Sequence, residues 1–199
     1  MSFTPLSTPF ERFTEVYARA RETDIPEPTA TALATADAHG RPTVRMVLLK
    51  GFDERGFVFY TNLASRKARD LETNPQAALC FHWQPLEMQV RIEGGVVPVS
   101  DAEADEYFAS RPRGSQLGAW ASRQSEVLES REMLENRLLE IGRRFPDDPV
   151  RRPAFWSGYR IRPLRIEFWE GRADRLHVRD LFTRDHPDAV EWEQRQLYP

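Results

Sequence analysis

The stretch RMVLLKGFDERGFVFYTNLASRK, residues 45–67, decides the fold because it contains two apolar, strand-like runs and then the start of a helix. The β-branched and aromatic residues in the runs 42–50 and 56–61 are typical of strands. The polar residues 53–56 between them predict a hairpin turn. Both faces of the first run are largely apolar, and this pattern predicts a strand that is covered on both sides.

Two cations, Arg45 and Lys50, belong to this first run. Successive side chains of a strand alternate between its faces, so Arg45 and Lys50 are expected on opposite faces. A desolvated charge is costly unless an anion or a carboxylate pairs with it. Each of the two cations therefore predicts a negatively charged partner.

The Ser65-Arg66-Lys67 cluster opens a predicted helix that runs towards Asn74 and stops before Pro75, with Ser65 as its cap. Cations in a first helical turn oppose the helix dipole, and a bound anion would remove that conflict. The cluster therefore predicts a binding site for a phosphorylated ligand. A solvated basic helix start is the alternative that these residues leave open.

The rest of the chain predicts a mainly β fold with packed helices, arranged as a mostly antiparallel barrel. A flexible N-terminal arm, residues 1–9, is expected to precede a single domain, residues 10–199, because no internal boundary or repeat is evident. The apolar spacing predicts helices at 10–23, 101–110 and 130–145, and strands at 29–36, 77–83, 87–97 and 158–170. The polar residues 37–40 predict a second hairpin turn.

The composition of the chain limits the kinds of molecule that it is expected to bind. The 28 Lys and Arg residues against 31 Asp and Glu give a net charge of -3, which argues against a nucleic-acid or anionic-membrane binder. Cys80 is the only cysteine, so no intrachain disulfide can form, and a reducing cytoplasm is expected. No apolar run approaches the roughly 20 residues of a spanning helix. The four histidines lack metal-ligand spacing, and no metal is expected.

Further polar clusters follow along the chain. Tyr107, Arg111, Arg113 and Ser115 form one such cluster around a predicted turn at 111–115. Its phenol, guanidinium and hydroxyl groups suit a phosphate monoester. An arginine-rich helix end is the alternative. Residues 119–125 offer Gln124 and Ser125 as neutral donors, or form an ordinary capped loop. Alternation would place Arg175, His177 and Arg179 on one side of a strand, either as a cationic surface or as a solvated edge.

Taken in order, the motifs RMVLLK, FYTN, SRKA, QVRIEG, SRPRGSQLGAWASRQS, IEFW and RLH-x-R resemble the pyridoxine (pyridoxamine) 5′-phosphate oxidase family, the flavin enzymes of vitamin B6 salvage. The resemblance covers residues from about Thr29 to Pro199. It implies a split β-barrel that forms a homodimer with FMN at the subunit interface. It also implies oxidation of pyridoxamine 5′-phosphate or pyridoxine 5′-phosphate to pyridoxal 5′-phosphate, with dioxygen as acceptor and hydrogen peroxide as a product.

The same resemblance implies two sets of site residues. The residues implied to contact FMN are Arg45, Met46, Val47, Leu48, Leu49, Lys50, Tyr60, Thr61, Arg66, Lys67, Gln89, Gln124, Ser125, Trp169 and Arg179. The residues implied to contact the substrate are Lys50, Tyr107, Arg111, Ser115, Arg175 and His177. Of these, Arg175 and His177 are implied to lie over the pyridine ring and to act in catalysis by orienting the substrate and easing proton loss.

Two other functions compete with this interpretation. One is an FMN oxidase of the same fold that acts on another substrate, such as the related enzymes of phenazine biosynthesis. The cluster around Arg111 argues against it, because a substrate without a phosphate would leave those cations unpaired. The other is a non-catalytic flavin-binding split barrel, which would have no reason to retain Arg175 and His177.

Overall fold

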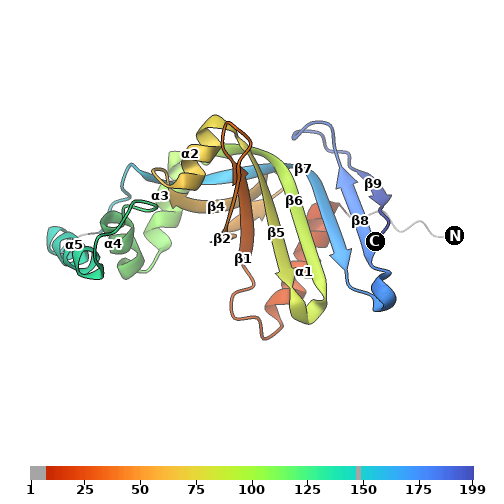
Figure 1. Ribbon diagram of the computed structural model, residues 1–199, viewed down its shortest axis with the longest axis horizontal. Coiled ribbons are helices and arrows are strands. Elements are labelled where there is room, and N and C mark those ends of the chain that lie inside the picture. Colours follow the sequence, from red (N-terminus) through yellow and green to blue (C-terminus); the bar gives the residue numbers. More distant parts are fainter. Residues whose placement is uncertain (1–7, 147–148) are drawn as a thin grey trace.

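The computed structural model describes residues 8–146 and 149–199, and within them nine strands form one antiparallel sheet that curls into a half-barrel (Figure 1). The strands are β1 (Ala30–Ala36), β2 (Pro42–Leu48), β3 (Gly51–Asp53), β4 (Gly56–Asn62), β5 (Gln76–Trp83), β6 (Met88–Pro98), β7 (Trp156–Glu170), β8 (Val178–Thr183) and β9 (Glu193–Gln196). Their order is β2-β1-β5-β6-β7-β4-β3, with β8 paired to β7 and β9 paired to β8. The predicted mainly β fold is confirmed.

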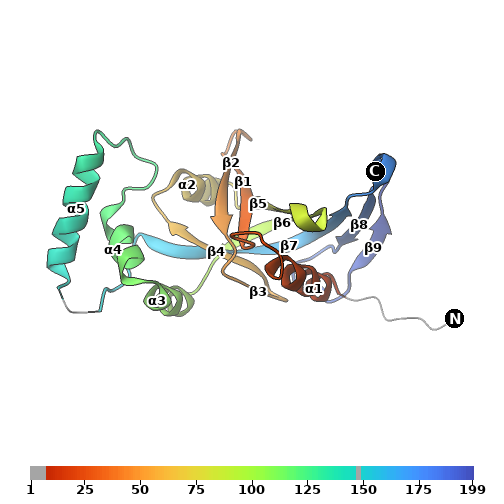
Figure 2. The same cartoon turned by 90° about the horizontal axis from the view of Figure 1, so that it is seen from below.

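Five α-helices and two short 3-10 turns accompany the sheet in these residues. They are α1 (Pro9–Arg21), α2 (Arg66–Thr73), α3 (Asp101–Ser110), α4 (Arg113–Ala121), α5 (Arg131–Arg144), η1 (Gln84–Leu86) and η2 (Ala173–Arg175). Helices α3, α4 and α5 lie at one end of the molecule, and β8 and β9 lie at the other (Figure 2). No helix among the described residues is long and apolar enough to cross a membrane.

Helix α1 supplies the centre of the core. Its residues Phe10, Phe13 and Val16 share one face and are buried against the sheet. The Phe13 ring lies edge-on to the rings of Phe52, Phe57 and Phe81, with centroids 4.8, 4.9 and 5.4 Å away. These contacts pack α1 against β3, β4 and β5.

The start of α1 corrects the expected boundary of the N-terminal arm. The helix begins at Pro9, and Thr8 caps it by accepting a hydrogen bond from the backbone N–H of Glu11. Residues 8 and 9 of the predicted arm, residues 1–9, thus belong to the capped helix, and residues 1–7 lie outside the described part of the chain. The sequence missed this capping box because Ser, Thr and Pro also typify irregular segments.

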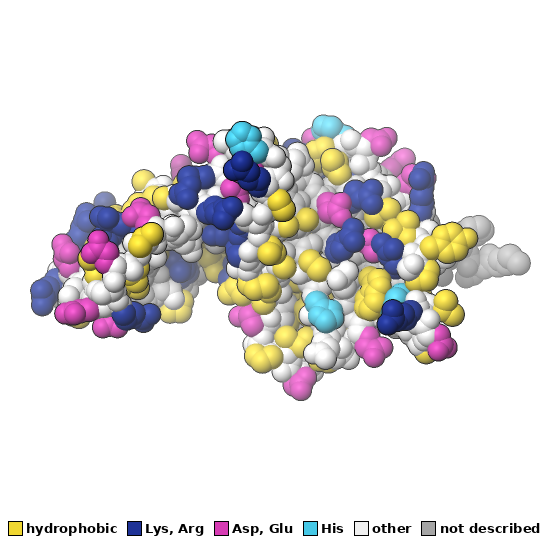
Figure 3. Space-filling model, in the orientation of Figure 1, with side chains coloured by type: hydrophobic (Ala, Val, Ile, Leu, Met, Phe, Trp, Pro, Cys, Tyr) yellow, Lys and Arg dark blue, Asp and Glu magenta, His cyan; other side chains and the backbone are white. Residues whose placement is uncertain are grey.

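Strand β2 differs from the prediction of a strand covered on both sides. It stands first in the sheet order and pairs only with β1 among the described strands. Val44 is 71% exposed and Met46 is 63% exposed. Figure 3 shows apolar and charged side chains mixed across this uncovered face of the sheet. An apolar strand face indicates that other residues bury it. It does not indicate whether those residues belong to the same chain or to another one.

The long strands β6 and β7 form the spine of the sheet. Pro163 does not break β7, because the pairing register shifts between Glu93 and Gly94 on β6 to accommodate it. Gly94 lies opposite Pro163, and a Cβ atom built there would stand 2.1 Å from the carbonyl oxygen of Arg162. Only glycine permits this close approach of two backbones.

Two segments have more structure than the sequence predicts. The expected turn at 111–115 is wrong, because α3 ends at Ser110 and Arg113 already begins α4. The segment after β7, where the sequence analysis considers a single strand around Arg175, His177 and Arg179, contains both β8 and β9. The two predicted hairpins at 37–40 and 53–56 are confirmed by the pairing of β1 with β2 and of β3 with β4.

Candidate functional site

A cavity of about 1040 Å³ lies between β2, β4, the start of α2 and α4 with the loop that follows it. Most of the predicted site residues line it. They are Arg45, Met46, Val47, Leu48, Lys50, Tyr60, Thr61, Arg66, Lys67, Tyr107, Arg111, Ser115, Gln124 and Ser125. Segments that are distant in the sequence thus build one space, and both predicted phosphate clusters face it.

Lys67 is the most unusual group in this cavity. Its side chain is buried, and its Nζ donates hydrogen bonds to Thr61 Oγ1 at 3.0 Å, Gln124 Oε1 at 3.2 Å and Ser65 Oγ at 3.3 Å. All three acceptors are neutral, and no ion pair found in residues 8–146 and 149–199 involves Lys67. Burial, reinforced by the charge of Arg45, lowers the pKa of Lys67 to about 8. The ammonium therefore lacks a counter-charge within the described chain.

The start of α2 differs in detail from the prediction. Ser65 occupies the cap position, but its hydroxyl makes no capping hydrogen bond and instead accepts from Lys67. The backbone N–H of Arg66 donates to Ser125 Oγ at 3.2 Å, so a residue of the loop after α4 takes over the capping role. The expected side-chain cap is wrong because Lys67 competes for the same oxygen.

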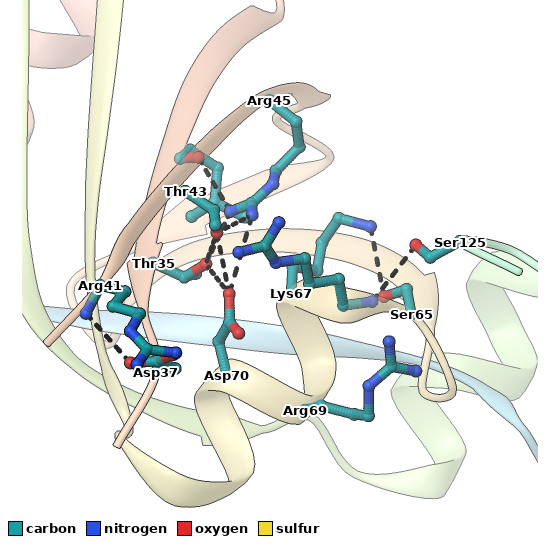
Figure 4. Close-up of polar contacts among 12 residues, drawn as sticks. Thr35, Asp37, Arg41, Thr43, Arg45, Ser65, Lys67, Arg69, Asp70 and Ser125 are labelled. Atoms are coloured by element: carbon teal, nitrogen blue, oxygen red, sulfur yellow. Dashed lines mark hydrogen bonds and ion pairs between the residues drawn. The ribbon is translucent and has the colours of Figure 1, made fainter. Parts of the chain in front are cut away.

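Arg45 finds the carboxylate that the sequence predicted for it. Its Nη2 lies 3.8 Å from Asp70 Oδ2, and its Nη1 donates to Thr35 Oγ1 at 2.7 Å (Figure 4). Burial lowers the pKa of Arg45, while Asp70 raises it and Arg66 lowers it further. Lys50 is exposed to solvent. Its charge is not desolvated there, so it does not need a negatively charged partner.

Aromatic rings and Arg111 form the other end of the cavity. The Tyr60 ring is stacked on the rings of Tyr107 and Trp156, with centroids 4.1 and 5.4 Å away. The Arg111 guanidinium lies 4.8 Å from the centre of the Trp156 ring, and burial lowers its pKa. Its Nη1 is buried and has no hydrogen-bond partner in the described residues. A donor left in this state is costly and is suited to receive an acceptor from a ligand.

Trp156 is a cavity residue that the sequence analysis missed. It is buried at the first position of β7 and supports both Tyr60 and Arg111. An aromatic residue at the start of a strand is equally typical of an ordinary core position, so no local signal marked it.

A second group of predicted residues does not line the cavity. Gln89, Trp169 and Arg179 are register partners across β6, β7 and β8. The His177 ring lies 4.6 Å from that of Trp169, and Arg179 donates to both carboxylate oxygens of Glu167, at 2.9 and 3.2 Å. Trp169 and Arg179 pair across β7 and β8, and β8 lies at the opposite end of the molecule from α3 and α4, which line the cavity (Figure 1).

Two further expectations differ from the structure. Arg175, His177 and Arg179 do not alternate along one strand, because β8 begins at Val178 and Arg175 lies in η2 with a φ of 61°. Leu49 is buried in the core and does not line the cavity. The sequence cannot reveal the 3-10 turn, since its backbone depends on a left-handed conformation that Arg175 seldom adopts.

Comparison with known proteins places this geometry in a family. The family model for pyridoxamine 5′-phosphate oxidase matches residues 18–143. The chain belongs to the pyridoxamine 5′-phosphate oxidase family. The family model for the pyridoxine 5′-phosphate oxidase C-terminal dimerisation region matches residues 156–199, which include β7, β8 and β9.

Similar curated proteins cover nearly the whole chain. A pyridoxine/pyridoxamine 5′-phosphate oxidase of Rubrobacter xylanophilus is 57% identical over 96% of this chain and 87% of its own length. The protein of the same name from Alkalilimnicola ehrlichii is 58% identical over 94% of this chain and 95% of its own length. The one from Brucella anthropi is 53% identical over 99% of this chain and 97% of its own length.

Solved structures share the fold. PhzG of Burkholderia lata, solved in complex with tetrahydrophenazine-1-carboxylic acid, superposes with a TM-score of 0.90 at 33% identity, over 98% of this chain and 95% of that one. A pyridoxamine 5′-phosphate oxidase-related, FMN binding protein of Nostoc punctiforme has a TM-score of 0.76 at 20% identity, with full coverage of both chains. The second likeness concerns the fold alone.

Proposed function

We propose that this chain oxidises pyridoxamine 5′-phosphate and pyridoxine 5′-phosphate to pyridoxal 5′-phosphate, with FMN as its cofactor. One observation carries the proposal: a single cavity contains two separate cationic clusters, one around Lys67 and one around Arg111. The reaction requires two phosphoesters in one site, one on the cofactor and one on the substrate. Relatives that are 53–58% identical bear the name of this oxidase.

The cluster around Lys67 fits the phosphate of FMN. A phosphate dianion would provide the counter-charge that the buried ammonium lacks, and Arg45 and Arg66 add two more cations. Ser125 and Gln124 add a hydroxyl and an amide at the same place. The cavity volume of about 1040 Å³ lies at the upper end of the range typical of small-molecule and cofactor sites.

The cluster around Arg111 fits the phosphate of the substrate. Its buried Nη1 would donate to a phosphate oxygen, and Tyr107 and Ser115 would add neutral hydroxyl donors. Lys50, at the exposed end of the wall formed by β2, would add a second cation. This set orients the substrate by its phosphate, so that its reactive carbon faces the cofactor.

The site is completed by a second copy of the chain in a homodimer. Gln89, Trp169 and Arg179 are proposed cofactor contacts, yet they lie away from the cavity of their own chain. The region 156–199 matches a dimerisation model, and it contains two of these three residues. The exposed side chains of Val44 and Met46 on the cavity wall offer the apolar surface that a second copy would cover.

When bound, FMN would supply the redox chemistry, as the acceptor of a hydride from the substrate carbon that bears the amine or hydroxyl, with dioxygen as the final electron acceptor and hydrogen peroxide as its product. The protein positions that carbon and excludes water. His177 Nδ1 accepts a hydrogen bond from the backbone N–H of Arg172 at 3.2 Å, which places the proton of a neutral ring on Nε2. Together with Arg175, this ring would orient the substrate and ease proton loss. A reducing cytoplasm is the proposed compartment, supported by the free Cys80.

Two alternatives are less well supported. PhzG, the structural neighbour with a phenazine ligand, is 33% identical, well below the named oxidases. An oxidase for a substrate without a phosphate would leave the Arg111 cluster unpaired. A non-catalytic flavin-binding barrel would need the Lys67 cluster but not Arg175 and His177.

One anaerobic titration tests the proposal. We expect the purified protein to be yellow, and pyridoxamine 5′-phosphate to bleach the flavin without oxygen, with colour and hydrogen peroxide appearing when air is admitted. Pyridoxamine without its phosphate should bleach far less at the same concentration, because it cannot engage Arg111. Bound flavin that is not bleached by the phosphorylated amine would contradict the proposal, and equal bleaching by both amines would contradict the assignment of Arg111.

A further inference from the structure

Asp70 lies behind the cationic wall of the cavity, where three elements meet. It is 6% exposed and belongs to α2, and its Oδ2 accepts hydrogen bonds from Thr35 of β1 at 2.7 Å and Thr43 of β2 at 2.8 Å (Figure 4). Thr43 lines the cavity but Asp70 does not. Thr43 therefore lies between the Asp70 carboxylate and any ligand in the cavity.

The same two hydroxyls hold Arg45. Its Nη1 donates to Thr35 Oγ1 at 2.7 Å and to the carbonyl oxygen of Leu33 at 3.1 Å, and its Nη2 donates to Thr43 Oγ1. A hydroxyl has one donor and two acceptor lone pairs, so each threonine can accept from Arg45 and donate to Asp70 at once. The guanidinium is therefore anchored at several points although it also lines the cavity.

The positive charges around Arg45 explain why its side chain needs to be anchored. Arg45, Arg66 and Lys67 line the same end of the cavity, and Arg45 is close enough to lower the pKa of Lys67. Mutual repulsion favours conformations in which the long Arg45 side chain turns away before a ligand binds. Among the described residues, Asp70 is the carboxylate that forms an ion pair with this group of cations.

We propose that Asp70 is a positioning residue that holds Arg45, through Thr35 and Thr43, ready for the phosphate of the cofactor. Asp70 acts without touching the ligand. The inference rests on the proposed function, because it assumes that the cationic end of the cavity receives the phosphate of FMN. A side chain that is already held in its bound conformation loses less conformational entropy when the ligand binds, and the affinity is higher for that reason.

The test compares Asp70→Asn with the unaltered protein in FMN titrations. Asparagine keeps the size of the side chain but removes its charge, and we expect Kd for FMN to rise about tenfold. In an Arg45→Gln background the same substitution should change Kd by less than about twofold, since the group it positions is gone. An unchanged Kd in Asp70→Asn, or the same factor in both backgrounds, would overturn the inference.

Two comparisons separate positioning from a general defect. Riboflavin lacks the phosphate, so its affinity should be the same in Asp70→Asn and in the unaltered protein, whereas a merely distorted cavity would weaken both ligands. Glu72→Gln removes the same charge from an exposed site on the same helix and should leave Kd for FMN unchanged. Loss of FMN binding by the unaltered protein would contradict the proposed function instead.

The threonines provide an independent test that does not require Asp70→Asn to fold. Thr35→Ser keeps the bridging hydroxyl and should bind FMN within about twofold of the unaltered protein. Thr35→Val keeps the shape but removes the hydroxyl, and it should weaken FMN by a factor similar to that of Asp70→Asn. If the valine variant binds FMN as well as the serine variant does, the bridge has no role and the inference is wrong.

Discussion

Lys67 shows how one residue can carry a function at the expense of stability. Three neutral oxygens satisfy its hydrogen bonds, but none supplies a negative charge. The resulting fall in pKa measures how unfavourable the ammonium is at this position. A bound phosphate would reverse that effect, so the same charge that destabilises the free protein stabilises the complex.

Lys67→Met separates these two effects. Methionine fills a similar volume without a charge, so we expect the FMN-free protein to melt a few degrees higher. FMN should bind at least about tenfold more weakly, because a charge-assisted contact to the phosphate is lost. Thermal unfolding without FMN and a fluorescence titration measure the two quantities. Arg69→Met on the exposed side of α2 is the control, and a lower melting temperature with unchanged FMN affinity would contradict the account.

The pKa of Lys67 also predicts how FMN affinity depends on pH. Below pH 8 the ammonium is charged in the free and the bound protein, so this group adds no pH dependence. Above pH 8 the free protein loses the proton that the phosphate requires, and affinity should fall as pH rises. Stability changes in the opposite sense, because the unfolded chain keeps the proton up to its ordinary pKa of 10.5 and the FMN-free fold gains stability between these values.

Titrations of FMN at several pH values from 7 to about 10 test this dependence. The decline should be absent in Lys67→Met, which has no group to titrate at this position. An equal decline in both proteins would assign the effect to another residue.

At the scale of elements, the sequence predicted what local pattern determines and missed what tertiary contacts determine. The hairpins at 37–40 and 53–56 carry strong turn signals and were predicted with their strands. Helix α4 was missed because two glycines weaken its local propensity. It is fixed instead by contacts such as the hydrogen bonds from Gln116 Nε2 to the carbonyl of Phe108 at 2.9 Å and from Trp120 Nε1 to that of Arg151 at 2.8 Å.

The site divides in a similar way. The sequence predicted the cations of the cavity because Arg66 and Lys67 conflict with the helix dipole. It did not predict Asp70 as the partner of Arg45, because the two residues are brought together only by the packing of α2 against β1 and β2. Nor could the sequence show that Trp169 lies outside the cavity. Both chains of a homodimer have the same sequence, so a motif does not indicate which of the two chains brings a residue to a site.

The bulge on β6 provides a prediction about an element. In Gly94→Ala the new methyl group would meet the carbonyl oxygen of Arg162, and we expect a loss of about 2–4 kcal/mol in the free energy of unfolding. Gly142→Ala in α5 is the matched control, because its methyl group meets nothing within 4 Å and should stabilise the helix by up to about 1 kcal/mol. Urea denaturation measures both, and equal stability of the two variants would show that the bulge tolerates a side chain.

At the scale of the whole molecule, the two groups of proposed site residues do not meet within a single chain. The cavity with Lys67 and Arg111 is lined in part by α3 and α4, whereas Trp169 pairs with β8 and His177 directly precedes β8, at the opposite end of the molecule (Figure 2). The face that includes Val44 has no cover within the described chain. A symmetric pair of chains resolves both features, because an isologous contact would place the second part of each site beside the cavity of the other chain.

Val44→Asp tests the role of this uncovered face. A charge at a position that a second copy covers should break the homodimer, and the monomer should lose FMN because its site is incomplete. Light scattering gives the mass, and absorbance gives the bound flavin. Leu139→Asp, at a residue of α5 that is 61% exposed and lies outside both the sheet and region 156–199, should remain a dimer with full flavin. A Val44→Asp dimer that binds FMN normally would contradict the predicted interface.

The most direct test of a site shared by two chains is a heterodimer that joins one Lys67→Met chain to one chain with both Arg175→Ala and His177→Ala. Assayed without added FMN, at a concentration where the Lys67→Met chain loses the cofactor, each homodimer should be nearly inactive. If the site is shared, the heterodimer contains one site with every substitution and one site with none, so we predict oxidase activity close to half that of the unaltered dimer, with one tightly bound FMN at the intact site. If each chain builds its own site, both sites of the heterodimer are damaged, and activity no higher than that of the two parent homodimers would contradict the account.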